Sequence, residues 1–161
     1  MPALFSLWPV LLTYVLSFVY IGIYGNNHHH MLHMTTRVNG KILWANLHLL
    51  FWLSLIPFTT GWMGENHFTP IPTAIYGVDL LLCGVAYAIL SGAIMDDQGA
   101  HSKLRAAVGK DVKGKMSALL YALAIPLALF HAWMAIAIFA GVAPMWLVPD
   151  RRIEERLDKH T

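Results

Sequence analysis

Charged residues and cysteines are scarce in this 161-residue sequence. Asp, Glu, Lys and Arg together make up 12% of the chain, and Cys83 is its one cysteine. Soluble domains carry roughly 25% charged residues. A lone cysteine excludes a disulfide scaffold, and a net charge of +2 is too small for a nucleic-acid-binding surface. The chain therefore belongs to neither of these classes, and its low charge content argues against an ordinary soluble domain.

The sequence also lacks the motifs of common enzymes. It has no glycine-rich phosphate loop, no nucleophile elbow and no His-Glu-x-x-His helix. We therefore expect no enzyme activity and no cofactor.

Apolar residues, by contrast, are abundant. They make up 57% of the chain. A soluble chain this small leaves a large share of its surface in water and could not bury so many apolar side chains. A lipid bilayer is the natural solvent for such a chain, so we predict an all-α integral membrane protein.

Three long apolar stretches are predicted to cross the membrane, at about residues 4–24, 42–62 and 73–95. The first contains no Asp, Glu, Lys, Arg or His. At ~1.5 Å per residue, each is long enough for a helix that spans the ~30 Å hydrocarbon core.

A fourth apolar run is too long for one span. Residues 116–148 contain no Asp, Glu, Lys or Arg and a single histidine, His131. Because ~20 residues suffice to cross a bilayer, we predict two shorter helices at about 114–130 and 132–148, with a turn at His131. The chain is then one membrane domain over residues 1–161 with five transmembrane helices.

The basic residues support five spans. The four connections and the tail hold two, none, five, none and four Lys or Arg, which accounts for all 11. Five spans place every one of them on one side of the membrane, as the positive-inside rule requires. This predicts a cytoplasmic tail at 149–161, with a short interfacial helix at 151–157, and an external N-terminus. An exported N-terminus without a signal peptide is unusual, and a preceding helix would bring it inside.

One ionisable residue and one row of small residues fall within the third span. Asp79 is a functional candidate because a charge at membrane depth is costly, although near the outer end it could also reach interfacial water or cap a neighbouring group. The small residues share a helical face, which suits close packing inside the subunit or at a subunit interface. They are Ala74, Gly77, Gly84, Ala88 and Ser91.

Polar residues also cluster around the first connection. His29 and His33 are four apart on a possible helix, but residues 26–41 hold no carboxylate or thiol to complete a metal site. We expect no bound metal, and instead a hydrogen-bond network at the cytoplasmic end or a simple interfacial turn. Asn46 and His48 point to nearly opposite faces, so at least one of them must face another helix. An amide within the bilayer needs a partner.

Several short stretches, spread in order over nearly the whole chain, form a recognisable pattern. They are Leu7-Trp8-Pro9, Tyr14-Val15-Leu16-Ser17-Phe18, Asn27-His28-His29-His30, Leu43-Trp44-Ala45-Asn46, Ile56-Pro57-Phe58-Thr59-Thr60, Ala124-Ile125-Pro126 and Trp146-Leu147-Val148-Pro149-Asp150-Arg151-Arg152. This pattern resembles the prokaryotic homologues of the endosomal/lysosomal potassium channel of animals.

The resemblance implies a six-helix subunit of a homotetrameric, potassium-selective channel in the prokaryotic plasma membrane. It implies passive permeation of potassium ions through an apolar constriction in the pore-lining first helix. A Phe-Ser-Asp motif on that helix would pack against polar groups of the next two helices. By motif match these groups are His28 or His29, Trp44 and Asn46.

The sequence departs from the family pattern in two places. The Phe-Ser-Asp helix is absent, so the five spans correspond to helices two to six of the family. Gly25 stands where the family often has Trp. A non-conducting accessory or truncated subunit is therefore an alternative. A haem-binding redox protein is a weaker alternative, because its candidate ligands His48 and His131 lie near opposite sides of the membrane in the predicted topology, too far apart for one haem.

Overall fold

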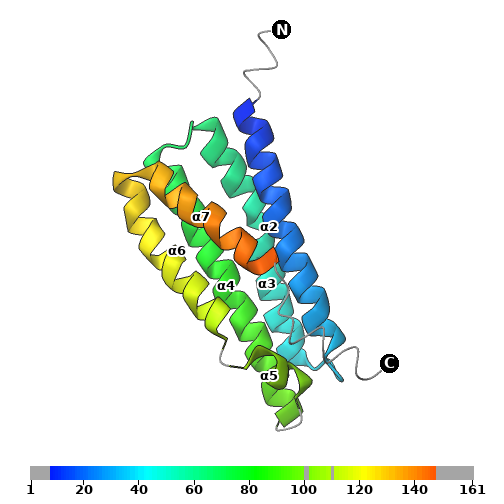
Figure 1. Cartoon of the computed structure of the whole chain (residues 1–161). Coiled ribbons are helices and arrows are strands. Elements are labelled where there is room, and N and C mark those ends of the chain that lie inside the picture. Colours follow the sequence, from blue (N-terminus) through cyan, green and yellow to red (C-terminus); the bar gives the residue numbers. More distant parts are fainter. Residues whose placement is uncertain (1–7, 100–101, 110, 148–161) are drawn as a thin grey trace.

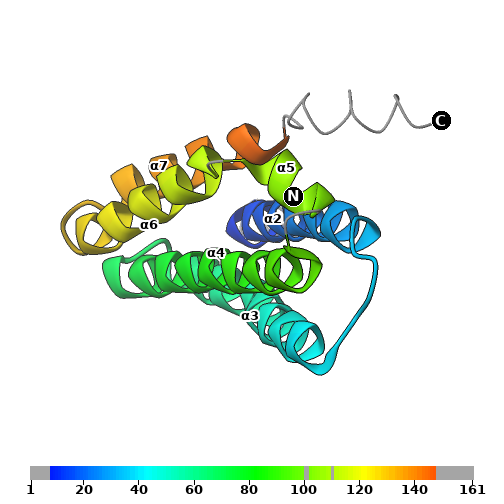
Figure 2. The ribbon, with the colours of Figure 1, turned by 90° about the horizontal axis from the view of Figure 1, so that it is seen from below.

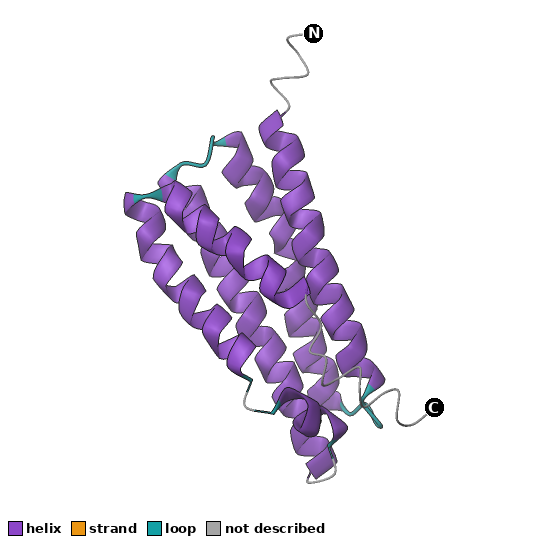
Figure 3. Ribbon diagram, viewed as in Figure 1, coloured by secondary structure: helices purple, strands orange, loops and turns teal. Residues whose placement is uncertain are grey.

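The computed structural model describes residues 8–99, 102–109 and 111–147, and these residues form six helices joined by short connections (Figures 1 and 3). The described part contains no strand. In order the helices are α2 (Trp8–His33), α3 (Gly40–Glu65), α4 (Pro70–Gln98), α5 (Lys103–Val108), α6 (Val112–Phe130) and α7 (Ala132–Leu147). The predicted all-α fold class is confirmed.

Four of these helices, α2, α3, α4 and α6, are long and apolar enough to cross a membrane. The fifth apolar helix, α7, has 16 residues, which correspond to a length of ~24 Å. Each predicted span falls on one of these helices. The largest difference is that α2 continues to His33, while α3 and α4 each extend two or three residues beyond the predicted span at both ends. The histidine cluster therefore lies on the last turns of a helix and not in a turn.

The break at His131 lies where the chain was expected to reverse. His131 has a non-helical backbone (φ −143°, ψ 79°), and its N–H donates to the Leu127 carbonyl to close α6. The carbonyl of His131 in turn accepts from the Met134 N–H at 3.0 Å and opens α7. A single residue thus separates two antiparallel helices.

Other helix ends have clear local causes. The Asn39 side chain accepts from the Ile42 N–H at 2.9 Å and caps α3. Pro70 opens α4, where a missing N–H costs nothing. Gly99 ends α4 with φ +61°, a conformation that glycine adopts without strain.

α4 is the central helix of the bundle. It packs against α3 on one side and α6 on the other, while α2 packs on α3 (Figure 2). α7 folds back along α6 and crosses to contact α4 and α2. Three buried aromatic rings join these elements, because Tyr76 makes edge-to-face contacts with Tyr20 at 6.2 Å and with Phe139 at 5.4 Å. A second apolar cluster, around Leu49 and Leu90, joins α3 to α4 farther along the bundle.

The connections alternate between the two ends of the bundle (Figure 1). Residues 34–39 and the segment with α5 lie at one end, which we call the basic end because it carries Arg37, Lys41, Lys103 and Arg105. Residues 66–69 and His131 lie at the opposite end. The short helix α5 was not predicted. Residues 4–7 and 148 of the predicted spans and the tail at 149–161, with its predicted helix, lie outside the described residues.

Candidate functional site

A polar contact between α2 and α3 joins two of the predicted site residues. His28 Nε2 and Asn46 Oδ1 are 2.6 Å apart, and both side chains are half-buried. The two helices are antiparallel neighbours, so residues near the end of α2 lie beside residues near the start of α3. The contact gives the Asn46 amide the partner that a polar group in a membrane requires.

The other two predicted residues lie on the surface of the chain. The Trp44 side chain is 74% exposed, and its indole forms no hydrogen bond within the described residues. His29 is exposed and stacks on His33, with ring centroids 6.3 Å apart. The structure therefore brings His28 and Asn46 together and leaves Trp44 and His29 facing outward. His48, which also faces outward, accepts a hydrogen bond from Trp52 Nε1 at 2.9 Å.

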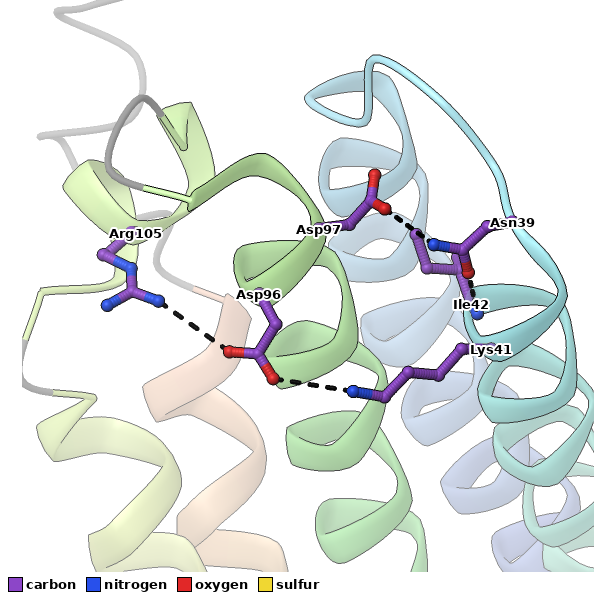
Figure 4. A network of polar contacts seen from close by, with 6 residues as sticks. All are labelled: Asn39, Lys41, Ile42, Asp96, Asp97 and Arg105. Atoms are coloured by element: carbon purple, nitrogen blue, oxygen red, sulfur yellow. Dashed lines mark hydrogen bonds and ion pairs between the residues drawn. The ribbon is translucent and has the colours of Figure 1, made fainter.

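A network of charged and polar side chains holds the basic end together (Figure 4). Asp96 at the end of α4 pairs with Lys41 at 3.6 Å and with Arg105 at 3.9 Å. Asn39 Nδ2 donates to the neighbouring Asp97 at 2.7 Å. These contacts join α3, α4 and α5, so the first and third connections meet at one end. Sequence reasoning noted the basic residues but missed their acidic partners, although Asp96 and Asp97 follow the third apolar span directly.

Asp79 is buried between helices and does not reach the surface. Its side chain is 3% exposed, and one carboxyl oxygen accepts from Thr59 Oγ1 on α3 at 2.8 Å. The other oxygen has no hydrogen-bond partner within the described residues, and neither has the buried hydroxyl of Tyr76, one turn earlier on α4. Thr59 was not singled out from the sequence as this partner, because nothing local shows which residue of α3 faces Asp79.

The row of small residues on α4 serves more than one neighbour. A Cβ atom added at Gly77 would lie 2.7 Å from Phe139 Cζ and 3.1 Å from Ile125 Cγ1, so this glycine permits close packing of α4 with α6 and α7. Gly84 and Ala88 instead line a cavity of about 250 Å³. Ser91 is buried farther along the helix. Gly77 therefore acts in packing within the chain.

Two long-range hydrogen bonds of aromatic side chains attach α7 to the bundle. The Tyr20 hydroxyl on α2 donates to the carbonyl of Phe139, and Trp146 Nε1 donates to Ser117 Oγ on α6 at 2.8 Å. Neither was predicted, because the partners are 119 and 29 residues apart. The sequence indicates only that a tyrosine hydroxyl or an indole N–H within a membrane needs an acceptor, and it does not show which residue supplies one.

No group of three His, Cys, Asp or Glu side chains able to hold a metal ion occurs in the part of the chain that the structure describes. His48 lies on the basic half of α3, while His131 forms the turn at the opposite end. Their placement does not favour axial ligation of one haem by this pair.

The apolar helices, their alternating connections and the buried polar contacts between them define a multi-pass helical membrane protein. Comparison with known proteins gives the family. Residues 1–57 match the family model described as the endosomal/lysosomal potassium channel TMEM175. The chain is 46% identical over 158 residues to potassium channel HX13_20290 of Chryseobacterium sp. (strain P1-3). The aligned region covers 96% of this chain and 82% of that protein.

A more distant relative matches in part. Potassium channel B446_29190 of Streptomyces collinus (strain DSM 40733 / Tue 365) is 28% identical over 92 residues, covering 55% of this chain and 45% of that protein. No solved structure matches. The chain belongs to the TMEM175 potassium channel family.

Proposed function

We propose that this protein is a subunit of a potassium-selective channel in the plasma membrane of a prokaryote. The observation that carries the proposal is the 46% identity, over 96% of the chain, to a protein named a potassium channel. The helices that are long and apolar enough to span a membrane agree with it. On this proposal the protein is not an enzyme, and its partners are potassium ions and the lipid bilayer.

The conduction pathway we propose is an apolar constriction at the centre of a homotetramer. Selectivity then comes from pore dimensions and the cost of dehydrating the ion, without a ring of backbone carbonyls. In this arrangement the pore-lining helix of the family packs against His28, His29, Trp44 and Asn46. The hydrogen bond between His28 and Asn46 supports this role because it fixes the rotation of α2 relative to α3. The outward-facing Trp44 and His29 add polar N–H groups on the same two helices.

We further propose that the basic end faces the cytoplasm and that the C-terminus lies on that side. The positive-inside rule supports this orientation, since the connections at this end carry the Lys and Arg of the described loops. α7 also runs back toward the basic end, where Trp146 meets Ser117 five residues into α6.

The test is ion flux through purified protein that is co-expressed with the family's pore-lining helix and reconstituted in potassium-loaded liposomes, with the chain alone measured in parallel. We expect potassium flux that exceeds sodium flux under matched gradients, together with a tetrameric mass in native mass spectrometry. Protein that is inserted and oligomeric but passes neither ion would contradict the conducting role and favour the non-conducting accessory subunit. Equal potassium and sodium flux would contradict selectivity.

A further inference from the structure

An aromatic-lined cavity of about 250 Å³ lies between α2, α4, α6 and α7, toward the basic end of the bundle. It plays no part in the conduction pathway proposed above. Its walls are mostly apolar, and five aromatic side chains contribute to them. These are Tyr20, Tyr24, Tyr87, Tyr121 and Trp146.

Small residues on α4 leave this space open, and contacts among the rings hold its walls in place. The nearest atom to a Cβ added at Gly84 is the Tyr24 hydroxyl, 3.8 Å away. Tyr87 makes edge contacts with Tyr24 and with Trp146, each with ring centroids 6.3 Å apart. Trp146 is in turn held by its hydrogen bond to Ser117. The rings are therefore fixed by their own partners and do not collapse into the cavity.

Water is a poor occupant of this space. The walls are mostly apolar, and apolar side chains give water few hydrogen-bond partners. The cavity also reaches the outer surface of the bundle, because Val85 and Ala88 line it and are themselves exposed on α4. In a membrane protein that surface faces hydrocarbon chains, which are the nearest apolar groups able to enter.

The polar rim of the cavity suits a phosphate group. Lys115 lies in the first turn of α6, lines the cavity, is exposed, and forms no salt bridge within the described residues. Asp111 lines the same rim, and one of its oxygens accepts from the Gly114 N–H at 3.1 Å as the cap of α6. Its negative charge opposes an anion, so Lys115 is the group at this rim that attracts a phosphate. A lysine at the headgroup level of a membrane attracts anionic lipid groups.

We propose that this cavity binds a phospholipid from the leaflet at the basic end. One acyl chain lies among the aromatic rings, and the phosphate pairs with the Lys115 ammonium. The proposal rests on the membrane setting of the protein and does not depend on potassium conduction.

The first experiment maps the acyl chain. The full chain is reconstituted in phosphatidylcholine vesicles that contain a phospholipid with a diazirine in the middle of one acyl chain, and cross-linked peptides are identified by mass spectrometry. We expect cross-links to concentrate on peptides that carry Tyr24, Tyr87 and Trp146. Gly84→Leu fills the cavity and removes these cross-links. Gly92→Leu, on the same helix but with open space around it, retains them.

Ala88→Leu is a second cavity-filling variant, used in case Gly84→Leu does not fold. Both variants are accepted only if they elute like the wild type in size-exclusion chromatography. Cross-links spread evenly over all exposed helix faces would overturn the proposal, since they report only the surrounding bilayer. Cross-links unchanged in both cavity-filling variants would overturn it too. A third outcome would also overturn it: no lipid cross-links, together with a cross-linked protein–protein product showing that a second copy of the chain covers the cavity.

The second experiment tests the headgroup. With an anionic phosphatidylglycerol probe, Lys115→Gln is expected to lower cross-linking about fivefold, which corresponds to about 1 kcal/mol for one lysine near anionic lipid. It should leave cross-linking of a matched diacylglycerol probe, which has no phosphate, unchanged. Lys103→Gln, another exposed lysine at the basic end, serves as the control. An equal loss for both probes, or no loss for either, would remove Lys115 from the site.

Discussion

At the scale of single residues, Asp79 shows how a carboxyl group is accommodated inside an apolar bundle. One of its oxygens accepts from Thr59 on the neighbouring helix at 2.8 Å, while the other has no partner within the described residues. Thr59 therefore supplies a hydrogen bond that no other described side chain offers. A polar group at membrane depth depends on such a partner, because lipid offers none.

Thr59→Val keeps the shape of the side chain and removes this donor. We expect the free energy of unfolding to fall by about 1–2 kcal/mol, the cost of leaving a buried polar group unpaired. Unfolding in a titration with sodium dodecyl sulfate measures the loss. Thr36→Val, at an exposed position in the connection between α2 and α3, is the control and should change the stability little. Equal losses in the two variants would mean that the hydrogen bond to Asp79 contributes nothing.

Asn46 is the second residue whose role depends on one contact. Asn46→Leu removes the acceptor that lies 2.6 Å from His28. When the family's pore-lining helix is present, we expect lower potassium flux and weaker oligomer assembly, together with a loss of stability of about 0.6–2 kcal/mol. Liposome flux and native mass spectrometry measure these effects. The matched control is Asn26→Leu on α2, where the side chain is exposed. Wild-type flux and an intact oligomer in Asn46→Leu would contradict the proposed role of Asn46 in supporting the pore-lining helix.

At the scale of helices, α4 organises the molecule because it contacts α3, α6 and α7. Its approach to α7 depends on Gly77, where the nearest side chain is the Phe139 ring. Phe139 also packs on Tyr76, so α7 is held by a ring that has little freedom to move aside. Without a hydrophobic force between helices in lipid, such close contacts supply much of the attraction.

Gly77→Ala tests this contact between helices. The new Cβ would lie 2.7 Å from Phe139 Cζ, so α7 must shift or the ring must rotate. We expect a loss of about 1–3 kcal/mol, as for other overpacked cores. The control is Gly92→Ala on the same helix, where a Cβ meets no atom within 4 Å. Thermal unfolding in detergent separates the two variants, and equal midpoints would show that α7 does not rely on this contact.

At the scale of the whole molecule, the helices alternate in direction so that the described basic connections share one end. The network around Asp96 joins two of these connections directly. A single helix over residues 116–148 would instead place the four basic residues of the tail across the membrane from those of the third connection. Sidedness is therefore the property that tests the whole arrangement.

Single cysteines in the connections test this sidedness. Thr36→Cys and Lys103→Cys should react with a membrane-impermeant maleimide from the cytoplasmic side, and Asn66→Cys only from outside. The native Cys83 is buried, so the unmodified protein gives the background signal. Labelling of positions 36 and 103 from opposite faces would overturn the topology and the proposed function with it.

The all-α class and the approximate positions of the five apolar helices followed from the sequence alone, whereas the short helix α5 and the extension of α2 to His33 did not. The thickness of a bilayer sets the length of a span, and the cost of moving a charge across it keeps lysine and arginine on one side. Both constraints act on local composition. For this reason the break at His131 could be predicted within the long apolar run, although nothing in that run showed it directly.

Only the tertiary structure decided which polar groups meet. It paired His28 with Asn46 and left the His29 and Trp44 side chains exposed on the surface of the chain. It also placed Thr59 beside Asp79. Gly77 and Gly84 lie in the same row of small residues, yet Gly77 packs against α6 and α7 while Gly84 lines a cavity. These outcomes depend on how each helix is rotated and shifted against its neighbours. Many side chains set that geometry together, and no local pattern in the sequence reveals it.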